Sequence, residues 1–319
     1  MKKKVLFICG SMNQTTQMHQ IADELVECDN YFTPHYATGF VDVLRKFRLA
    51  EMSVIGYRLA NRCLEYLKLH NLSVDYGGRK YDYDLVVTCA DLIVQKNIRD
   101  KKVILVQEGM VDPINFVYHL IKKFPFLPHW WAGTNVAGLN DQYIYFCVAS
   151  DGYRDLFVER GVNHNKIRIT GIPNFDNCRK YYDNDFPHRD YVLVCTSDFR
   201  EKYRYENRKQ FIRQALEIAN GRQLFFKLHP SENHTRAEAE IKRWAPDALV
   251  YKTGSAEEMV ANCQTFITRF SSTVLVAAAL GKETVSDIDP DELKVLAPVQ
   301  HAKAAKNIAD VCRELLNLV

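Results

Sequence analysis

The chain alternates between short runs that are apolar along their whole length and longer stretches in which apolar residues recur with helical spacing. The apolar runs include KVLFICG (4–10), YDLVVTC (83–89), KVILVQEG (102–109), YIYFCVAS (143–150), YVLVCTS (191–197), QLFFKLHP (223–230) and TFITRF (265–270). A strand that is buried on both faces reads as a continuous apolar run, so the alternation predicts parallel sheets covered by helices. The expected fold class is therefore α/β.

The length of the chain favours two domains, because a single core rarely grows beyond ~250–300 residues and this chain has 319. The polar stretch 177–190 has little pattern and reads as a linker between two similar halves. We therefore expect two Rossmann-like, doubly wound domains facing a cleft, 1–178 and 190–319. The last predicted helix, 304–319, is the one element that we allow to pack back on the first domain. Within the first half, residues 41–70 read as a long helical stretch that can hold one helix or two.

Composition restricts the partners and the compartment. A net charge of +3 is too small to favour a nucleic-acid partner, and nine cysteines without a paired spacing indicate free thiols in a reducing compartment. The apolar runs are too short to span a bilayer, so the expected location is cytoplasmic. Segment 122–131 nevertheless mixes lysines with Phe124, Phe126, Trp130 and Trp131, which suits peripheral contact with the inner face of a membrane or a lipid-linked acceptor. Ordinary packing of these aromatic residues is the alternative.

Ligands of doubly wound folds bind at the carboxyl ends of the strands, which makes the strand exits the places to search. The first exit, CGSMNQTTQ, places Gly10, Asn13 and Gln14 at a helix start, where backbone amides can bind an anion or a sugar hydroxyl. A plain turn with an N-cap is the alternative. The exit lacks the glycine spacing of a dinucleotide or phosphate loop, so no cofactor is predicted.

Glu108 comes directly after a four-residue apolar strand in VILVQEG and precedes Gly109. A carboxylate in this position can act as a general base. It could also cap the helix that we expect to begin near Asp112 and Pro113, but those two residues are good helix starters by themselves. Glu108 is therefore left without an obvious structural role.

In the second half, the strand 223–228 ends on His229 and Pro230. The proline restricts the backbone of His229 and fixes its exit from the strand, so that the imidazole can donate to a phosphate or sugar oxygen. Lys227 points to the same face but lies deeper along the strand. The alternative is a histidine that merely satisfies a local hydrogen bond.

A further exit reads TRFSST, with Arg269 before the paired serines Ser271 and Ser272 and with Thr273 after them. Serines and free amides at a helix start can hold a phosphate, although simple capping explains the same residues. Arg200, in the polar loop after strand 191–197, can supply positive charge to a nucleotide; a solvated loop is the alternative.

The ordered set of Glu108-Gly109, His229-Pro230 and Ser271-Ser272 resembles the bacterial glycosyltransferases of the GT-B architecture that use CMP-activated acids. These are the sialyltransferases, polysialyltransferases and capsule Kdo transferases. KLHP followed by SS is also similar to CDP-glycerol glycerophosphotransferases, and RITGIPNFD to UDP-N-acetylglucosamine 2-epimerases. One departure is Gln107, since the acidic motif commonly has two acidic residues before its glycine.

The resemblance implies an inverting, metal-independent glycosyltransferase of surface polysaccharide or glycolipid synthesis, with a nucleotide-sugar donor and a glycan or lipid-linked acceptor. Glu108 would remove the proton of the acceptor hydroxyl, and His229 would stabilise the leaving phosphate. Ser271 and Ser272 would hold that phosphate. A UDP-sugar 2-epimerase, for which Asp91 and Asp112 are further acids near strand ends, a glycerophosphotransferase and a nucleotide-sugar-binding scaffold stay open.

Overall fold

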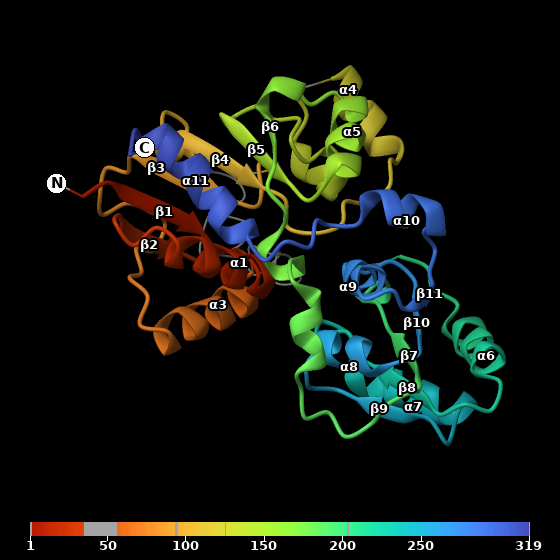
Figure 1. Cartoon of the computed structure of the whole chain (residues 1–319). Coiled ribbons are helices and arrows are strands. Elements are labelled where there is room, and N and C mark those ends of the chain that lie inside the picture. The colour runs from red at the N-terminus through yellow and green to blue at the C-terminus, as the bar shows by residue number, and fades with distance from the viewer. Residues whose placement is uncertain (1, 35–55, 93–94, 125, 203, 319) are drawn as a thin grey trace. The chain divides into compact units, whose positions relative to one another are not determined.

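The computed structural model describes residues 2–34, 56–92, 95–124, 126–202 and 204–318 (Figure 1). It divides into two compact units, of which the first contains Met1–Asp176 with His301–Val319 and the second contains Asn177–Gln300. The expected linker 177–190 is thus part of the second unit, and it carries a short 3-10 segment, η6 (Cys178–Tyr182). Residues 301–319, the end of the expected second domain, belong to the first unit, and they include the last helix, which we allowed to pack back on the first domain.

The first unit contains a six-stranded sheet in the order β2-β1-β3-β4-β5-β6, in which every pairing is parallel. The strands are β1 (Lys4–Ile8), β2 (Asp29–Thr33), β3 (Leu85–Thr88), β4 (Lys102–Val106), β5 (Tyr145–Val148) and β6 (Ile167–Ile169). The helices are α1 (Met12–Asp23), α3 (Tyr57–Leu69), α4 (Phe116–Lys123), α5 (Asp151–Arg160) and α11 (Ala304–Leu316). The strand order reverses between β1 and β3, which is where doubly wound sheets open to a ligand.

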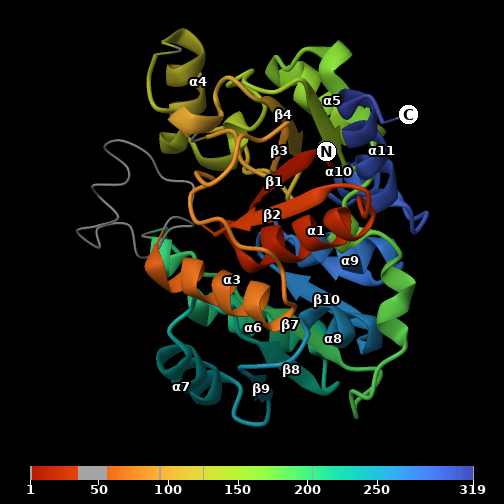
Figure 2. The same ribbon diagram turned by 90° about the vertical axis from the view of Figure 1, so that its left-hand side faces the viewer.

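The second unit contains a five-stranded parallel sheet in the order β11-β10-β7-β8-β9, whose strands are labelled in Figure 1. Figure 2 shows β10, β7, β8 and β9 from a second side. Its strands are β7 (Val192–Cys195), β8 (Leu224–Lys227), β9 (Leu249–Tyr251), β10 (Thr265–Thr268) and β11 (Glu283–Val285). Its helices are α6 (Arg208–Ala219), α7 (His234–Trp244), α8 (Ala256–Asn262), α9 (Thr273–Ala279) and α10 (Pro290–Leu296). Here the order reverses between β7 and β10. The structure therefore has the expected two-domain α/β architecture with Rossmann-like sheets.

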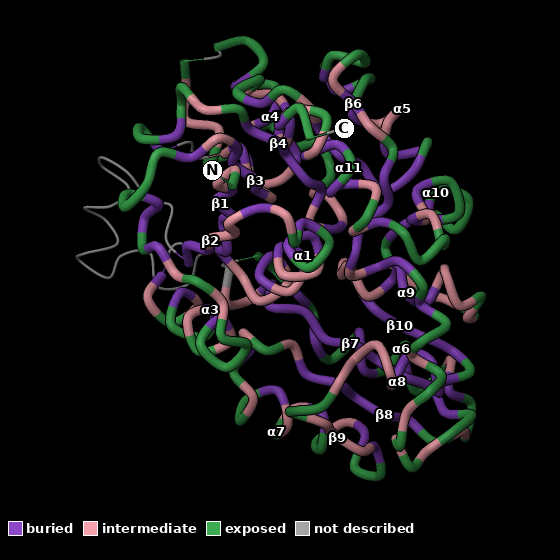
Figure 3. Tube along the Cα trace, turned by 60° about the vertical axis from the view of Figure 1, so that its left-hand side comes forward, coloured by how far each residue is buried: buried purple, intermediate pink, exposed green. Residues whose placement is uncertain are grey.

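Most of the strands that the sequence predicted are buried, whereas the predicted edge strands β6 and β9 are partly exposed. The tube of β1, β3, β4, β7 and β8 is mostly purple in Figure 3, and β3, β7, β8 and β10 are buried at every position. We did not predict β2, β11 or α10. The sequences of β2 (DNYFT) and β11 (ETV) are partly exposed and contain polar residues, because both strands lie at a sheet edge. Of the predicted helical stretch 41–70, α3 accounts for 57–69, and residues 41–55 lie outside the described residues.

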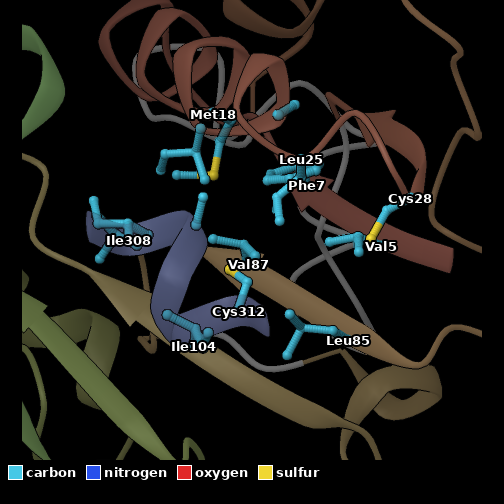
Figure 4. Close-up of a cluster of buried hydrophobic side chains, with 14 of the residues drawn as sticks. Val5, Phe7, Met18, Leu25, Cys28, Leu85, Val87, Ile104, Ile308 and Cys312 are labelled. Carbon is cyan, nitrogen blue, oxygen red and sulfur yellow. The ribbon is translucent and has the colours of Figure 1, made fainter. Parts of the chain in front are cut away.

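Helix α11 completes the core of the first unit. Its Ile308, Ala309 and Cys312 are fully buried in one cluster with Val5 and Phe7 of β1 (Figure 4). The same cluster contains Met18 and Ile21 of α1, so the last helix packs on the first one. This core includes both ends of the first unit's chain, which explains why 301–319 belong to that unit.

Asp176 fixes the start of α11. One carboxylate oxygen accepts hydrogen bonds from the backbone N–H groups of His301 and Ala302, both at 2.8 Å. The other oxygen accepts from Lys303 at 2.7 Å and from Ala304 at 2.8 Å. Burial alone would raise the pKa of Asp176, but the hydrogen bonds from these backbone groups lower it below its ordinary value. A buried carboxylate thus supplies the acceptors that the first turn of α11 needs.

We expect Asp176→Asn to lower the free energy of unfolding by about 2–3 kcal/mol, because hydrogen bonds to a charged acceptor become bonds to a neutral one and one acceptor oxygen is lost. The native pKa is depressed, so this stabilisation is complete above the unfolded value of about 4 and disappears as the pH falls through the native pKa. Urea unfolding of both proteins at neutral and acidic pH measures the difference. An equal gap between the two proteins at both pH values would show that the charge of Asp176 does not stabilise the fold.

Candidate functional site

The exit of β1 and the exit of β4 meet in the first unit through a hydrogen-bonded cluster at the start of α1. The carboxylate of Glu108 accepts from Ser11 Oγ at 2.8 Å and from Gln14 Nε2 at 2.6 Å. Asn13 Nδ2 donates to the backbone oxygen of Glu108 at 3.1 Å, and Gln14 Oε1 accepts from the Gly10 N–H at 2.8 Å. The structure therefore brings Gly10, Asn13, Gln14 and Glu108 together. The donors and the N-terminus of α1 stabilise the negative charge of Glu108.

Gln107, the departure from the acidic motif, has a structural role that an acidic residue could not fill in its ionised form. Its Nε2 donates to the backbone oxygen of Gly109 at 2.8 Å, while its Oε1 accepts from the Ala149 N–H at 2.9 Å. The side chain is buried and links the exit of β4 to the end of β5. A carboxylate has no proton to donate to Gly109, so the amide suits this position.

The two other acids near strand ends, Asp91 and Asp112, already accept hydrogen bonds from neighbouring loops. Asp91 is buried after β3 and accepts from the N–H groups of Gly138 and Asn140, and its burial raises its pKa to about 6. Asp112 accepts from Thr134 Oγ1 at 2.7 Å. Asp112 and Pro113 do not start α4, because the N-cap is Asn115, whose side chain accepts from the Tyr118 N–H.

The second unit contains a pocket with a volume of about 210 Å³ at the carboxyl ends of its strands. Residues from the exits of β7, β8, β9 and β10 line it together. They are Cys195, Thr196, Lys227, Leu228, His229, Pro230, Gly254, Ser255, Ala256, Glu257, Ser271 and Thr273. The pocket lies where the strand order reverses between β7 and β10, which is the position expected for a ligand of a doubly wound sheet.

His229 is fixed on both its backbone and its ring. Its N–H donates to Thr196 Oγ1 at 2.9 Å, and its Nδ1 accepts from the Ser231 N–H at 3.1 Å. Because Nδ1 accepts this bond, the neutral ring carries its proton on Nε2. The ring belongs to the pocket lining and is about one third exposed, with a side-chain exposure of 34%. The ring therefore lies in the pocket lining with a fixed orientation.

Lys227 is the positive charge of this pocket. It is the last residue of β8 and is buried, and the one hydrogen bond described for its Nζ is a long one of 3.4 Å to the backbone oxygen of Leu228. Burial lowers the pKa of Lys227. A buried ammonium with weak protein contacts gains from an anionic ligand that replaces its lost hydration.

The residues of the serine motif have different positions: Ser271 lines the pocket, whereas Ser272 is the N-cap residue of α9. Ser271 and Thr273 line the pocket, and their hydroxyl oxygens lie 2.8 Å apart in a hydrogen bond. Ser272 is the N-cap residue of α9, but its side chain makes no capping hydrogen bond, and it is absent from the described residues that line the pocket. The hydroxyl pair beside Lys227 is therefore Ser271 with Thr273 rather than Ser271 with Ser272.

Two predicted binding residues lie elsewhere among the described residues. Arg200 makes two parallel hydrogen bonds, of 2.9 and 2.8 Å, to the carboxylate of Glu240. Arg269 donates through Nε to Asp287 at 2.6 Å. Neither arginine is among the pocket residues of the described ranges. Both guanidinium groups already have carboxylate partners, so we remove them from the candidate site.

Sequence reasoning missed Thr196 and the segment Gly254–Glu257. The Ser255 hydroxyl accepts from the Glu258 N–H at 3.1 Å, so Ser255 and Glu258 have the spacing of a capping box at the start of α8. That spacing predicts a helix start, but the sequence does not reveal that it lies beside the exit of β8. Glu257 places a carboxylate in the same pocket as Lys227.

A buried ionic network lies behind His229. Thr196 Oγ1 donates to Glu232 Oε2 at 2.6 Å, and Glu232 Oε1 accepts from Arg208 Nη2 at 2.5 Å. Arg208 also donates to Glu206 at 2.8 Å, and the side chains of Glu206 and Glu232 have no exposed surface. Thr196 is thus held by the network on one side and holds the His229 N–H on the other. Within the described ranges, no group of three or more His, Cys, Asp or Glu side chains is arranged to hold a metal ion.

Comparisons with known proteins identify the fold. No family model matches the chain, and no curated protein matches its sequence. Among solved structures, a UDP-GlcNAc 2-epimerase from Neisseria meningitidis bound to UDP-GlcNAc is 12% identical with a TM-score of 0.61, over 98% of this chain and 100% of that one. The UDP-N-acetylglucosamine 2-epimerase from Rickettsia bellii is 10% identical with a TM-score of 0.58, over 100% and 97%. The wall teichoic acid polymerase TagF is 11% identical with a TM-score of 0.54, over 99% and 89%.

These similarities establish the two-domain, Rossmann-like fold that GT-B-type proteins share. Epimerases and glycerophosphotransferases were the more distant members of the resemblance seen in the sequence. The sialyltransferase-like group does not appear among these three structures.

We expect Thr196→Val to change the position of the His229 ring and to lower the free energy of unfolding. Valine keeps the volume but removes the acceptor of the His229 N–H and the donor to Glu232, which should cost about 1–3 kcal/mol. Thr265→Val is the matched control. Thr265 is also a buried threonine with side-chain hydrogen bonds, to Glu283 and Arg222, but it lies at the amino end of β10, away from the pocket. Urea unfolding measures stability, and imidazole ¹H–¹⁵N spectra report on His229. Unchanged His229 resonances in a folded Thr196→Val protein would contradict the positioning role of Thr196.

Proposed function

We propose that the protein is an inverting, metal-independent glycosyltransferase that uses a nucleotide-activated sugar and acts in surface polysaccharide or glycolipid synthesis. The observation that carries the proposal is the pocket of the second unit, where Lys227, His229 and the hydroxyl pair Ser271–Thr273 line one cavity. Cleavage of the bond to an anomeric carbon leaves negative charge on the departing phosphate. Fixed donors aimed at that charge lower the barrier.

The pocket residues divide into groups that suit the parts of a nucleotide. Lys227, His229 Nε2 and the hydroxyl pair suit a phosphate. Glu257 is a carboxylate, and carboxylates accept hydrogen bonds from hydroxyl groups, so it suits the two hydroxyls of a ribose. The lining contains one lysine, and this single cation suits the one phosphate charge of a CMP-activated sugar better than the two phosphate charges of a nucleoside diphosphate sugar.

Glu108 is the proposed base of this reaction. Its Oε1 accepts from Ser11 and, at 3.5 Å, from Asn13. Its Oε2 accepts one described hydrogen bond, from Gln14, and keeps a lone pair that can take the proton of an acceptor hydroxyl. Attack by that hydroxyl on the anomeric carbon, with departure of the phosphate, would invert the configuration at that carbon. The proposed acceptor is a glycan or a lipid-linked glycan, and contact of segment 122–131 with a membrane would bring the enzyme to the latter.

A UDP-sugar 2-epimerase is the second candidate, and the similarity of the fold to two such epimerases favours it. One observation argues against an epimerase: the carboxylates of Asp91 and Asp112, its further candidate acids, already accept hydrogen bonds from neighbouring loops. TagF similarly supports a glycerophosphotransferase. Product analysis separates these activities: a transferase releases free nucleotide only when an acceptor is present, whereas an epimerase isomerises UDP-GlcNAc without an acceptor. A scaffold would bind nucleotide and do neither. Transfer that persists unchanged in Glu108→Gln would remove Glu108 from the role of base.

A thermal-shift panel of CMP, CDP, UDP and GDP tests the proposed donor class. A ligand at 100 times its dissociation constant stabilises the folded state by ~2.7 kcal/mol if it binds that state alone. We expect a cytidine nucleotide to raise the melting temperature most, with GDP as the purine control. A UDP shift without a CMP shift would favour UDP-sugar chemistry, and the absence of any shift would contradict a nucleotide site.

A further inference from the structure

The first unit exposes a set of large apolar side chains around α4 and the 3-10 segment η2 (His129–Trp131). Phe116 is 78% exposed, Phe126 is 82% exposed and Trp131 is 50% exposed. Ile114, Phe124 and Trp130 are also exposed. We call these six side chains the aromatic surface. Isolated exposed apolar residues are ordinary, but six within one short segment indicate a surface that binds a partner.

The segment that carries these six side chains also contributes one small core. Tyr118 and Ile121 of α4 are buried in a cluster with Ala132 and Val136, and Leu127 packs against it. Helix α4 therefore already buries one face within the unit, and its other face presents Phe116, His119 and Lys123 to solvent. Exposed rings also contact each other in pairs, Phe124 with Phe126 at 6.0 Å between centroids and Trp130 with Trp131 at 6.1 Å. Both main views place α4 at the periphery of its unit (Figures 1 and 2).

Helix α4, which carries Phe116 and Lys123, is fixed to its unit by hydrogen bonds. The side chain of Asn115 caps α4 by accepting from the Tyr118 N–H. Lys122 Nζ donates to the backbone oxygen of Arg160 at the end of α5, at 2.9 Å, and the Tyr118 hydroxyl donates to the same oxygen at 3.1 Å. A preformed apolar surface loses little conformational entropy on binding, which favours association.

The charge of this segment indicates what covers it. Residues 113–140 contain no aspartate or glutamate, in a chain that has 39 acidic residues among 319. The charged side chains within the segment are Lys122 and Lys123, and Lys123 Nζ lies 5.6 Å from the centroid of the exposed Phe124 ring. Cations beside Trp and Phe side chains match the interface of an anionic bilayer. The rings enter the headgroup region and the ammonium group of Lys123 remains at the phosphates, while Lys122 Nζ is bonded to the Arg160 backbone.

We propose that the aromatic surface docks on a bilayer that contains anionic lipid, with Phe116, Phe126, Trp130 and Trp131 in the headgroup region and Lys123 at the lipid phosphates. Docking does not require the proposed nucleotide chemistry, so it can be tested without donor or acceptor. Among the described residues, no helix is long and apolar enough to cross a membrane.

Co-sedimentation with vesicles tests the proposal. The whole chain should sediment with equimolar phosphatidylglycerol and phosphatidylcholine, and much less with phosphatidylcholine alone. The fluorescence of Trp130 and Trp131 should shift to the blue on binding. Phe116→Ser combined with Phe126→Ser should weaken binding at least about tenfold, because two large apolar side chains no longer enter the interface. Lys123→Glu should weaken binding about tenfold, and less at high salt.

Matched controls come from exposed residues elsewhere. Tyr205→Ser removes a ring that is 87% exposed, and Lys306→Glu reverses an exposed charge. Neither change should affect vesicle binding, and melting curves should show all variants folded. Failure of the wild-type chain to bind anionic vesicles, or equal binding by the double variant, would overturn the proposal. A dimer in gel filtration that the double variant abolishes would show instead that this surface binds a second copy of the chain.

Discussion

Parallel strand pairing is the constraint on which both sheets, and the candidate site, depend. Every pairing in the two sheets is parallel, so all carboxyl ends of a sheet lie at one edge. Residues far apart in the chain, such as Thr196, Lys227 and Ser271, meet in one pocket for this reason alone. The same constraint brings Gly10 and Glu108 into one hydrogen-bonded cluster in the first unit.

Strand pairing does not position the helix starts and loops, and buried polar groups fix two of them: the start of α11 and the backbone at His229. Asp176 accepts hydrogen bonds from four consecutive N–H groups and so fixes the start of α11, whose apolar residues then pack in the core of the first unit. Thr196 connects the His229 backbone to the ionic network of Glu232 and Arg208. Removing one member of such a network leaves a buried group without its partner, which costs more free energy than the hydrogen bond contributes. The bonds of Asp176 and the network of Thr196, Glu232 and Arg208 show what these buried polar side chains do: each one fixes a segment of backbone or a neighbouring side chain.

Sequence patterns predicted most of the fold, because central parallel strands are apolar on both faces and few other structures give such runs. The same reasoning failed at β2 and β11, where an edge position permits polar residues. His229 and Lys227 could be found because they end an unmistakable strand. Glu257 and Thr196 could not, since their importance comes from neighbours distant in the chain. The sequence could not decide the role of Arg200. A basic residue in a loop can bind a ligand or a carboxylate, and its carboxylate partner, Glu240, is distant in the chain and visible only in the structure.

The central claim is that the pocket at the ends of β7, β8 and β10 binds the phosphate of a nucleotide. Calorimetric titration of CMP into the wild type, Ser271→Ala/Thr273→Val and Ser272→Ala tests it most directly. The double variant removes both hydroxyls of the pocket, whereas Ser272 lies beside them in sequence but not among the described pocket residues. We predict that the double variant binds CMP at least about tenfold more weakly, since two hydrogen bonds to a charged group are lost, and that Ser272→Ala binds as the wild type does. Equal CMP affinity in all three folded proteins would contradict the account.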